Sequence, residues 1–299
     1  MAIIPNSCKF HVVSSTVDTV DRGSAEFQSQ RKVFTMSDIS ETIGSSPYVT
    51  SGGALSIKPS GGTNTMGANA SCSVIMGGTT NTVDSPLSFF GSGVGNTIEQ
   101  CGTNIAIVGA NDTCILRNAV NMSNLFIGAA FSATMCGQSS SAIIAGGNHC
   151  MERASGSFIG AGDQNTTTQS NTFIGTGFNN CVCGTGSGFV AGSNNSISGS
   201  ASFIGAGNSH CITSAGQTSV IAGGASNCIQ ARGSGILGGC DNVVPASCDH
   251  AMIVGSDITA DRVCATFVNN LSIKNIPTAS TGLPSGSVWS NSGVLNIVP

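Results

Sequence analysis

The sequence predicts an all-β protein, a parallel β-solenoid or β-roll of about twelve rungs with about 16 residues in each. One observation is a repeated pattern through the middle of the chain, in which an apolar pair, one or two glycines and a polar step ending in Asn precede a second apolar position. The composition agrees, because Gly makes up 41 of 299 residues, whereas charged residues are only 8% and aromatic residues 5%. A disordered Gly/Ser linker is disfavoured because 40% of the chain is apolar and recurs in register.

The repeat is clearest at residues 157–162, 172–177 and 202–207, which read SFIGAG, TFIGTG and SFIGAG. We take the second residue of each apolar pair as a marker, which gives Ile75, Phe90, Val108, Ile127, Ile144, Ile159, Ile174, Val190, Ile204, Ile221, Leu237 and Ile253. The mean step is (253 − 75)/11, or about 16 residues. This period is shorter than a helix–loop–helix unit and fits one solenoid turn.

Charge is almost absent from the repeats, with no Lys between Lys58 and Lys274. Stacked rungs explain this, because a charge repeated at one position would face its copy about 4.8 Å away. The net charge is −4 without a basic cluster, so we expect neither nucleic acid nor an anionic membrane as a partner. The first residues lack a basic start and a long apolar run, so we expect neither the usual secretion signal nor a membrane span.

Five of the thirteen cysteines occupy one position of the repeat, six or seven residues after a marker: Cys114, Cys150, Cys181, Cys211 and Cys228. At a repeated position Cys can act as a small buried apolar residue, and we expect reduced thiols there. The alternative is a ladder of disulfides between adjacent rungs. A metal site at the Cys-Val-Cys sequence of residues 181–183 is disfavoured, because it lacks the second ligand pair that zinc requires.

Residues 1–50 differ in composition and predict a small separate module. Residues 10–13 and 32–35 are expected to be strands, and residues 38–41 have the spacing of a helix capping box. Residues 51–70 form a join rich in Gly, Ser and Asn, either flexible or an irregular first rung. The repeats occupy residues 71–264.

The apolar pairs predict a second buried face. Side chains alternate across a strand, so Phe158 and Ile159 point to opposite faces and both faces are apolar. A lone solenoid needs one buried face, so we expect identical chains to supply the other layer in a homotrimer. The residues expected to pack in the core or between chains are Ile75, Ile127, Ile144, Phe158, Ile159, Phe173, Ile174, Phe203, Ile204 and Ile221.

Residues 265–299 lose the period and predict a C-terminal cap or tip. Residues 282–286 are a turn signal, and two apolar segments flanking residues 290–293 predict a β-hairpin that closes the solenoid. Trp289, the only Trp, lies in this hairpin. It is expected either to cover the last rung or to contact a receptor.

The Ser-Phe-Ile-Gly-Ala-Gly units resemble the β-roll repeats of trimeric autotransporter adhesin heads, and still more the repeat regions of tailed-phage fibre proteins. The segment 33–43 is similar to an N-terminal stretch of cyanophage-type virion proteins, and 282–295 is similar to the end of many phage structural proteins. The resemblance implies a homotrimeric virion fibre assembled in the host cytoplasm, whose N-terminal module contacts other tail proteins and whose tip contacts a host receptor such as a glycan.

No catalytic, cofactor-binding or metal-binding residue can be named from the sequence. Glycan-cleaving tailspikes need paired carboxylates, whereas Asp112, Glu152, Asp163 and Asp241 lie on different rungs. Clustered acids near the end, Asp249, Asp257 and Asp261, are expected in turns, and His149 and His210 are expected to make a hydrogen bond at a repeat position. The sequence therefore favours a non-enzymatic fibre for host attachment. The alternatives are a purely structural or decorating virion component, then a bacterial adhesin or a polysaccharide-degrading spike.

Overall fold

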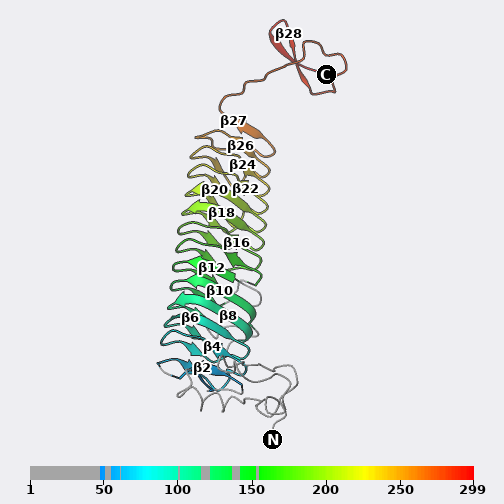
Figure 1. Cartoon of the computed structure of the whole chain (residues 1–299). Coiled ribbons are helices and arrows are strands. Elements are labelled where there is room, and N and C mark those ends of the chain that lie inside the picture. Colours follow the sequence, from blue (N-terminus) through cyan, green and yellow to red (C-terminus); the bar gives the residue numbers. More distant parts are fainter. Residues whose placement is uncertain are drawn as a thin grey trace, which may run out of the picture. The chain divides into compact units, whose positions relative to one another are not determined.

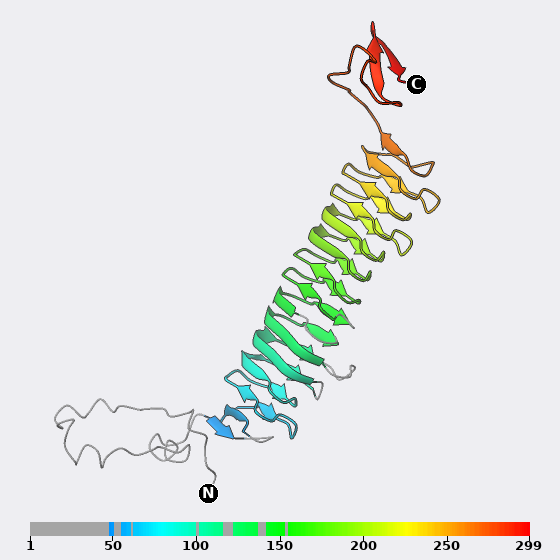
Figure 2. The same ribbon diagram turned by 90° about the vertical axis from the view of Figure 1, so that its right-hand side faces the viewer.

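The computed structural model describes residues 48–50, 55–60, 62–99, 102–115, 122–136, 142–152 and 155–299. All their regular structure is β, and the predicted parallel solenoid is confirmed: two long sheets run side by side along a stack of about twelve turns (Figures 1 and 2). No helix occurs in these ranges. The strands expected at residues 10–13 and 32–35 and the capping box at 38–41 lie outside the described residues.

Sheet A contains fifteen strands, all paired in parallel except the first pair, which is antiparallel. Its strands are β1 (Tyr48–Thr50), β2 (Ile57–Pro59), β4 (Val74–Ile75), β6 (Phe89–Val94), β8 (Gly102–Asn111), β10 (Met122–Ala130), β12 (Ala142–Gly146), β14 (Phe158–Ile159), β16 (Phe173–Ile174), β18 (Gly188–Ser193), β20 (Phe203–Asn208), β22 (Val220–Ile221), β24 (Gly235–Ile236), β26 (Met252–Val254) and β27 (Thr266–Val268).

Sheet B contains twelve parallel strands, each following a strand of sheet A in the chain. They are β3 (Thr65–Met66), β5 (Thr82–Val83), β7 (Thr97–Ile98), β9 (Cys114–Ile115), β11 (Thr134–Cys136), β13 (Cys150–Glu152), β15 (Thr166–Thr167), β17 (Cys181–Val182), β19 (Ser196–Ile197), β21 (Cys211–Ile212), β23 (Cys228–Ile229) and β25 (Val243–Val244). The predicted hairpin is also present, as antiparallel β28 (Val288–Asn291) and β29 (Val294–Ile297).

The solenoid extends beyond both ends of the repeat predicted at residues 71–264. At the N-terminal side, β2 pairs with β4 and β3 pairs with β5, so residues 57–66 form a first rung. Of the two alternatives for the join, this part is therefore the irregular rung. At the other end, β27 pairs with β26 and adds one more strand to sheet A.

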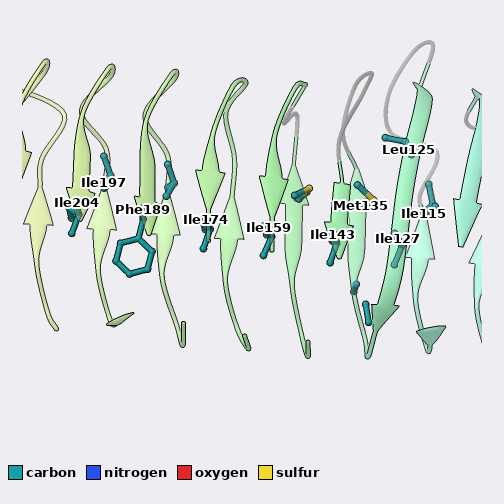
Figure 3. Packing of buried hydrophobic residues seen from close by; sticks show 14 of the residues in the cluster. Ile115, Leu125, Ile127, Met135, Ile143, Ile159, Ile174, Phe189, Ile197 and Ile204 are labelled. Atoms are coloured by element: carbon teal, nitrogen blue, oxygen red, sulfur yellow. The ribbon is translucent and has the colours of Figure 1, made fainter. Parts of the chain in front are cut away.

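The core lies between the two sheets. Most strands of the solenoid contribute one inward residue, and the longer strands β8 and β10 each contribute three, Ile105, Ile107 and Ala110 and then Leu125, Ile127 and Ala130. Ile159 and Ile174 of sheet A are fully buried, as are Ile212 and Ile229 of sheet B. Equivalent residues stack from rung to rung, as Figure 3 shows for Ile143, Ile159 and Ile174 among others. Burying such a side chain stabilises the fold by roughly 1.5–3 kcal/mol.

In four of the twelve rungs the core residue is not the marker but the first member of the apolar pair. The pairing register places Ile107, Ile143, Phe189 and Ile236 in the core column, so Val108, Ile144, Val190 and Leu237 follow the core residue. The cause is the preceding corner, because the core residue stands two positions after a buried corner residue such as Ser187 or Ser234. The preceding turn, and not hydrophobicity, therefore determines which residue of an apolar pair is buried.

Two buried polar ladders line the corners where the chain passes between the sheets. In the serine ladder, Ser187 Oγ donates to the Gly199 carbonyl (2.8 Å) and accepts the Ser202 N–H (3.0 Å). In the asparagine ladder, Asn180 Oδ1 accepts the Asn195 N–H (3.0 Å), and Asn180 Nδ2 donates to the Gly192 carbonyl (3.0 Å). These bonds satisfy backbone groups that would otherwise be buried without partners.

A glycine three residues before each ladder Asn makes room for its amide. Gly177 has φ = 141°, and a Cβ there would lie 2.6 Å from Asn180 Nδ2. In the two rungs where Ala110 and Ala130 take this position, the ladder residue shrinks to Thr113 and Ala133. The Gly-x-x-Asn spacing in the sequence is therefore a steric requirement of the corner.

Candidate functional surfaces

Next to the core column, the outward face of sheet A is apolar along the solenoid. The residues immediately before and after each core residue point outward, because side chains alternate across a strand. From Val74 to Val254 these positions hold only apolar residues and glycine. The exposed large side chains on this face include Met76, Phe89, Val108, Phe126, Phe173, Val190, Phe203, Val220, Leu237 and Val254. Further along the longer strands, Asn111 of β8 and Asn208 of β20 are also exposed.

The residues expected to pack in the core or between chains divide between the two sides of sheet A. Ile75, Ile127, Ile159, Ile174, Ile204 and Ile221 are buried in the core. Phe158, Phe173 and Phe203 point outward; Phe173 is 42% and Phe203 40% exposed. Phe158 and Phe173 stack at 5.6 Å between ring centroids and 5° between planes. Ile144 follows the core residue Ile143, and its side chain is not described.

The outward face of sheet B is polar. Its pairing register aligns Thr and Cys in one column, as in the series Thr166, Cys181, Ser196, Cys211 and Cys228. The shared position of the cysteines is confirmed, but Cys181, Cys211 and Cys228 are not buried. The core positions of these strands are taken by Val182, Ile212 and Ile229, so alternation turns the thiols outward to partial exposure.

Adjacent rungs bring two cysteines together, since Cys211 and Cys228 are register partners and both are free thiols. A hydrogen bond from the Cys211 thiol lowers the pKa of Cys228, and the same bond raises the pKa of Cys211. On another strand, Cys181 Sγ lies 2.8 Å from Cys183 Sγ. Within the described residues, no group of three or more His, Cys, Asp or Glu is placed to hold a metal ion.

Both ladder histidines make the hydrogen bond expected at their repeat position. Nδ1 of His210 accepts the Asn227 N–H (3.2 Å), and Nδ1 of His149 accepts the Asn165 N–H (3.4 Å). Nε2 of His210 is buried without a hydrogen-bond partner. Burial lowers the pKa of His210, an effect that the carbonyls of Ala206 and Gly224 partly offset. This imidazole is a neutral part of the corner, because Nδ1 must stay unprotonated to accept.

Several acidic side chains contact amides, backbone N–H groups or an adjacent Arg. Asp163 Oδ1 accepts from Asn148 Nδ2 (3.2 Å), and Asp249 Oδ1 accepts the Arg232 N–H (2.9 Å). Asp257 lies in a bend with φ = 57°, and Asp261 pairs with its neighbour Arg262 (2.8 Å). These are the turn roles expected from the sequence.

Trp289 lies in strand β28 of the C-terminal hairpin, opposite Asn296 of β29. Its side chain is partly buried, and it is not part of the solenoid's buried core cluster. A partly exposed Trp on a hairpin can make a contact with a ligand or another protein.

None of the described segments forms a helix long and apolar enough to cross a membrane. No protein-family model matches the chain, and no curated protein matches it. The features that bear on function are therefore the two sheet faces and the segments 33–43 and 282–295, which resemble phage proteins.

Proposed function

We propose that this chain is a non-enzymatic fibre protein of a phage virion, whose solenoid holds a C-terminal tip away from the particle for host attachment. The observation that carries the proposal is the uninterrupted stacking of two parallel sheets from residue 57 to residue 268. At about 4.8 Å for each rung, the stack is about 55 Å long. Interlocked corner ladders make it stiff along its length.

The surface chemistry supports a spacer more than an enzyme. The outward positions of sheet B carry mainly small uncharged groups, and several of the described acids make turn contacts. The segment resemblances at 33–43 and 282–295 favour a virion over a bacterial surface. In this proposal the N-terminal module contacts other tail proteins, and Trp289 is the candidate receptor contact.

Labelling of purified virions tests the proposal. Gold-labelled antibodies against the solenoid, residues 71–264, are expected to mark a fibre that projects from the particle. Antibodies against the hairpin, residues 288–297, should mark its free end. Solenoid label without hairpin label would favour the structural or decorating component, and an absence of both labels from virions would overturn the proposal.

A sugar-release assay separates attachment from glycan cleavage. Purified full-length chain incubated with envelope polysaccharide of the host is expected to release no reducing sugar and to block phage adsorption. Release of reducing ends would contradict the non-enzymatic assignment. The matched control is the Trp289→Ala variant, which should lose the blocking activity while keeping the β-structure of the solenoid.

A further inference from the structure

Most rungs of sheet A carry one large apolar residue and one small residue at the two outward positions, whereas the rungs of Ile75 and Ile253 carry two large ones. The two outward positions flank the core residue, and the large residue stands before it in some rungs and after it in others. The pairs whose side chains are described are Phe89/Gly91, Ala106/Val108, Phe126/Gly128, Phe158/Gly160, Phe173/Gly175, Gly188/Val190, Phe203/Gly205, Val220/Ala222 and Gly235/Leu237. Neither position faces the core. Rung stacking does account for the glycines at 91, 160, 175 and 205, because a Cβ at each would lie 2.3–2.4 Å from a carbonyl oxygen of the next rung.

The small residues let the large side chains lie along the sheet. A Cβ on Gly160 would lie 3.1 Å from Cε1 of Phe158, so the ring extends over its own glycine. Likewise a Cβ on Gly235 would lie 2.9 Å from Cε of Met252 on the next rung. The result is an even apolar strip, which we call the sheet A strip and define as the residue pairs above.

The sheet A strip is larger than a monomer usually exposes. The exposed fraction of its large exposed side chains ranges from 38% for Phe126 to 55% for Leu237. With roughly 150–200 Å² for each side chain, this is about 75 Å² of apolar area for each rung, and about 750 Å² for ten rungs when Met76 and Val254 of the flanking rungs are included. Monomers rarely expose more than about 600 Å² in one patch, and a stable interface needs about 800 Å² from each partner.

We propose that the sheet A strip is the surface through which a second copy of this chain packs, parallel and with equal rungs at equal height. A two-fold rotation axis along the solenoid reverses the strand direction across the interface. The position before the core residue in one copy then faces the position after it in the other. Phe173 therefore meets Gly175 of the adjacent copy, and each rung with one large and one small residue becomes complementary to itself.

An antiparallel arrangement lacks this match, because rungs of different type would then meet. The strip has no charge to attract a partner of another chemistry, whereas its one-large, one-small pairing in most rungs fits a second copy. The proposal concerns this face alone and holds whether or not the chain belongs to a virion. Failure of the virion-labelling experiment would contradict the proposed function and would leave the interface proposal intact. A monomeric chain in solution would overturn the interface proposal, whatever the labelling shows.

The first test is the mass of the full chain in solution, measured by sedimentation equilibrium. The unmodified chain is expected at twice its 29.7 kDa. The double variant Phe173→Asp/Phe203→Asp should sediment at the monomer mass with unchanged β-sheet circular dichroism, since both positions face outward. The matched control, Thr166→Asp/Ser196→Asp, places the same charges on sheet B and should keep the multimer. A monomeric unmodified chain, or a multimeric Phe173→Asp/Phe203→Asp variant, would overturn the proposal.

The second test determines register with a photoreactive aromatic residue, benzoylphenylalanine, in place of Phe173. Illumination should join two chains, and mass spectrometry should place the linked atom on residues 172–176 of the other copy. A crosslink to a distant rung would contradict the parallel arrangement. Benzoylphenylalanine is aromatic and position 173 faces outward, so we expect the variant to fold. The absence of a crosslinked product between chains would therefore also count against the interface.

Discussion

Replacing His210 with Asn is expected to stabilise the solenoid. His210 occupies an asparagine-ladder position, and its Nε2 is buried without a hydrogen-bond partner. In the same place one rung further, Asn227 Nδ2 donates to the carbonyls of Gly223 (3.2 Å) and Gly239 (3.0 Å). An Asn at position 210 can make both corresponding bonds, to Ala206 and Gly224, while its Oδ1 still accepts the Asn227 N–H.

Opposing effects set the magnitude. Satisfying a buried donor is worth about 1–3 kcal/mol, and the second bond adds about 1 kcal/mol. The carboxamide is smaller than the imidazole and loses about 1–2 kcal/mol of packing. We therefore expect a net gain of about 1–2 kcal/mol in the free energy of unfolding at pH 7.5.

The gain should grow in acid. Burial holds the pKa of His210 in the folded chain below 6.5, so the unfolded chain binds the proton more tightly. The stability that depends on neutral His210 is complete above pH 6.5 and is lost as the pH falls through the folded pKa. Asn does not titrate, so His210→Asn removes this contribution to acid destabilisation.

Urea unfolding followed by circular dichroism at pH 7.5 and pH 5.5, at one protein concentration, measures both effects. The control is His250→Asn, which removes an exposed imidazole from a turn with φ = 60°, a conformation that Asn tolerates. A His210→Asn variant with a lower midpoint than the unmodified chain, or with an unchanged dependence on pH, would refute the reasoning.

Three further predictions concern other parts of the chain. Gly192→Ala should lower the free energy of unfolding in urea by about 3 kcal/mol or more, because φ is 136° and a Cβ would meet the next rung's backbone. The control Gly109→Ala, where a Cβ would enter open space, should change it by less than about 0.5 kcal/mol. The rate of Cys228 carboxymethylation, measured by mass spectrometry, should rise with pH with a midpoint near the Cys228 pKa of about 6, and this midpoint should move to higher pH in Cys211→Ala. An unshifted midpoint would exclude the Cys211 hydrogen bond as the cause of the low pKa. Trp289→Ala should leave the melting temperature of the solenoid unchanged, since Trp289 is outside its core, and should weaken host adsorption; a lower melting temperature would instead support a capping role.

The sequence alone was sufficient for the solenoid, its period and its C-terminal hairpin. Repetition carries this information, because every rung must bury the same columns and therefore reuses the same residue types. The exclusion of charge and the shared position of the cysteines follow from the same stacking. The doubly apolar pairs, such as Phe158 and Ile159, likewise predict an apolar outer face, and the structure places Phe158 outward and Ile159 in the core.

Only the tertiary structure decided which member of an apolar pair is buried. In Ile107-Val108 and Ile236-Leu237 both residues are hydrophobic, and the distance from the preceding corner selects the first. That selection fixes which member of each pair lies on the outward face of sheet A. On sheet B, Val182, Ile212 and Ile229 fill the core, so the thiols that precede them face outward. A one-residue shift reverses the facing of every side chain in a strand, so hydrophobicity alone cannot resolve it and the backbone turn does.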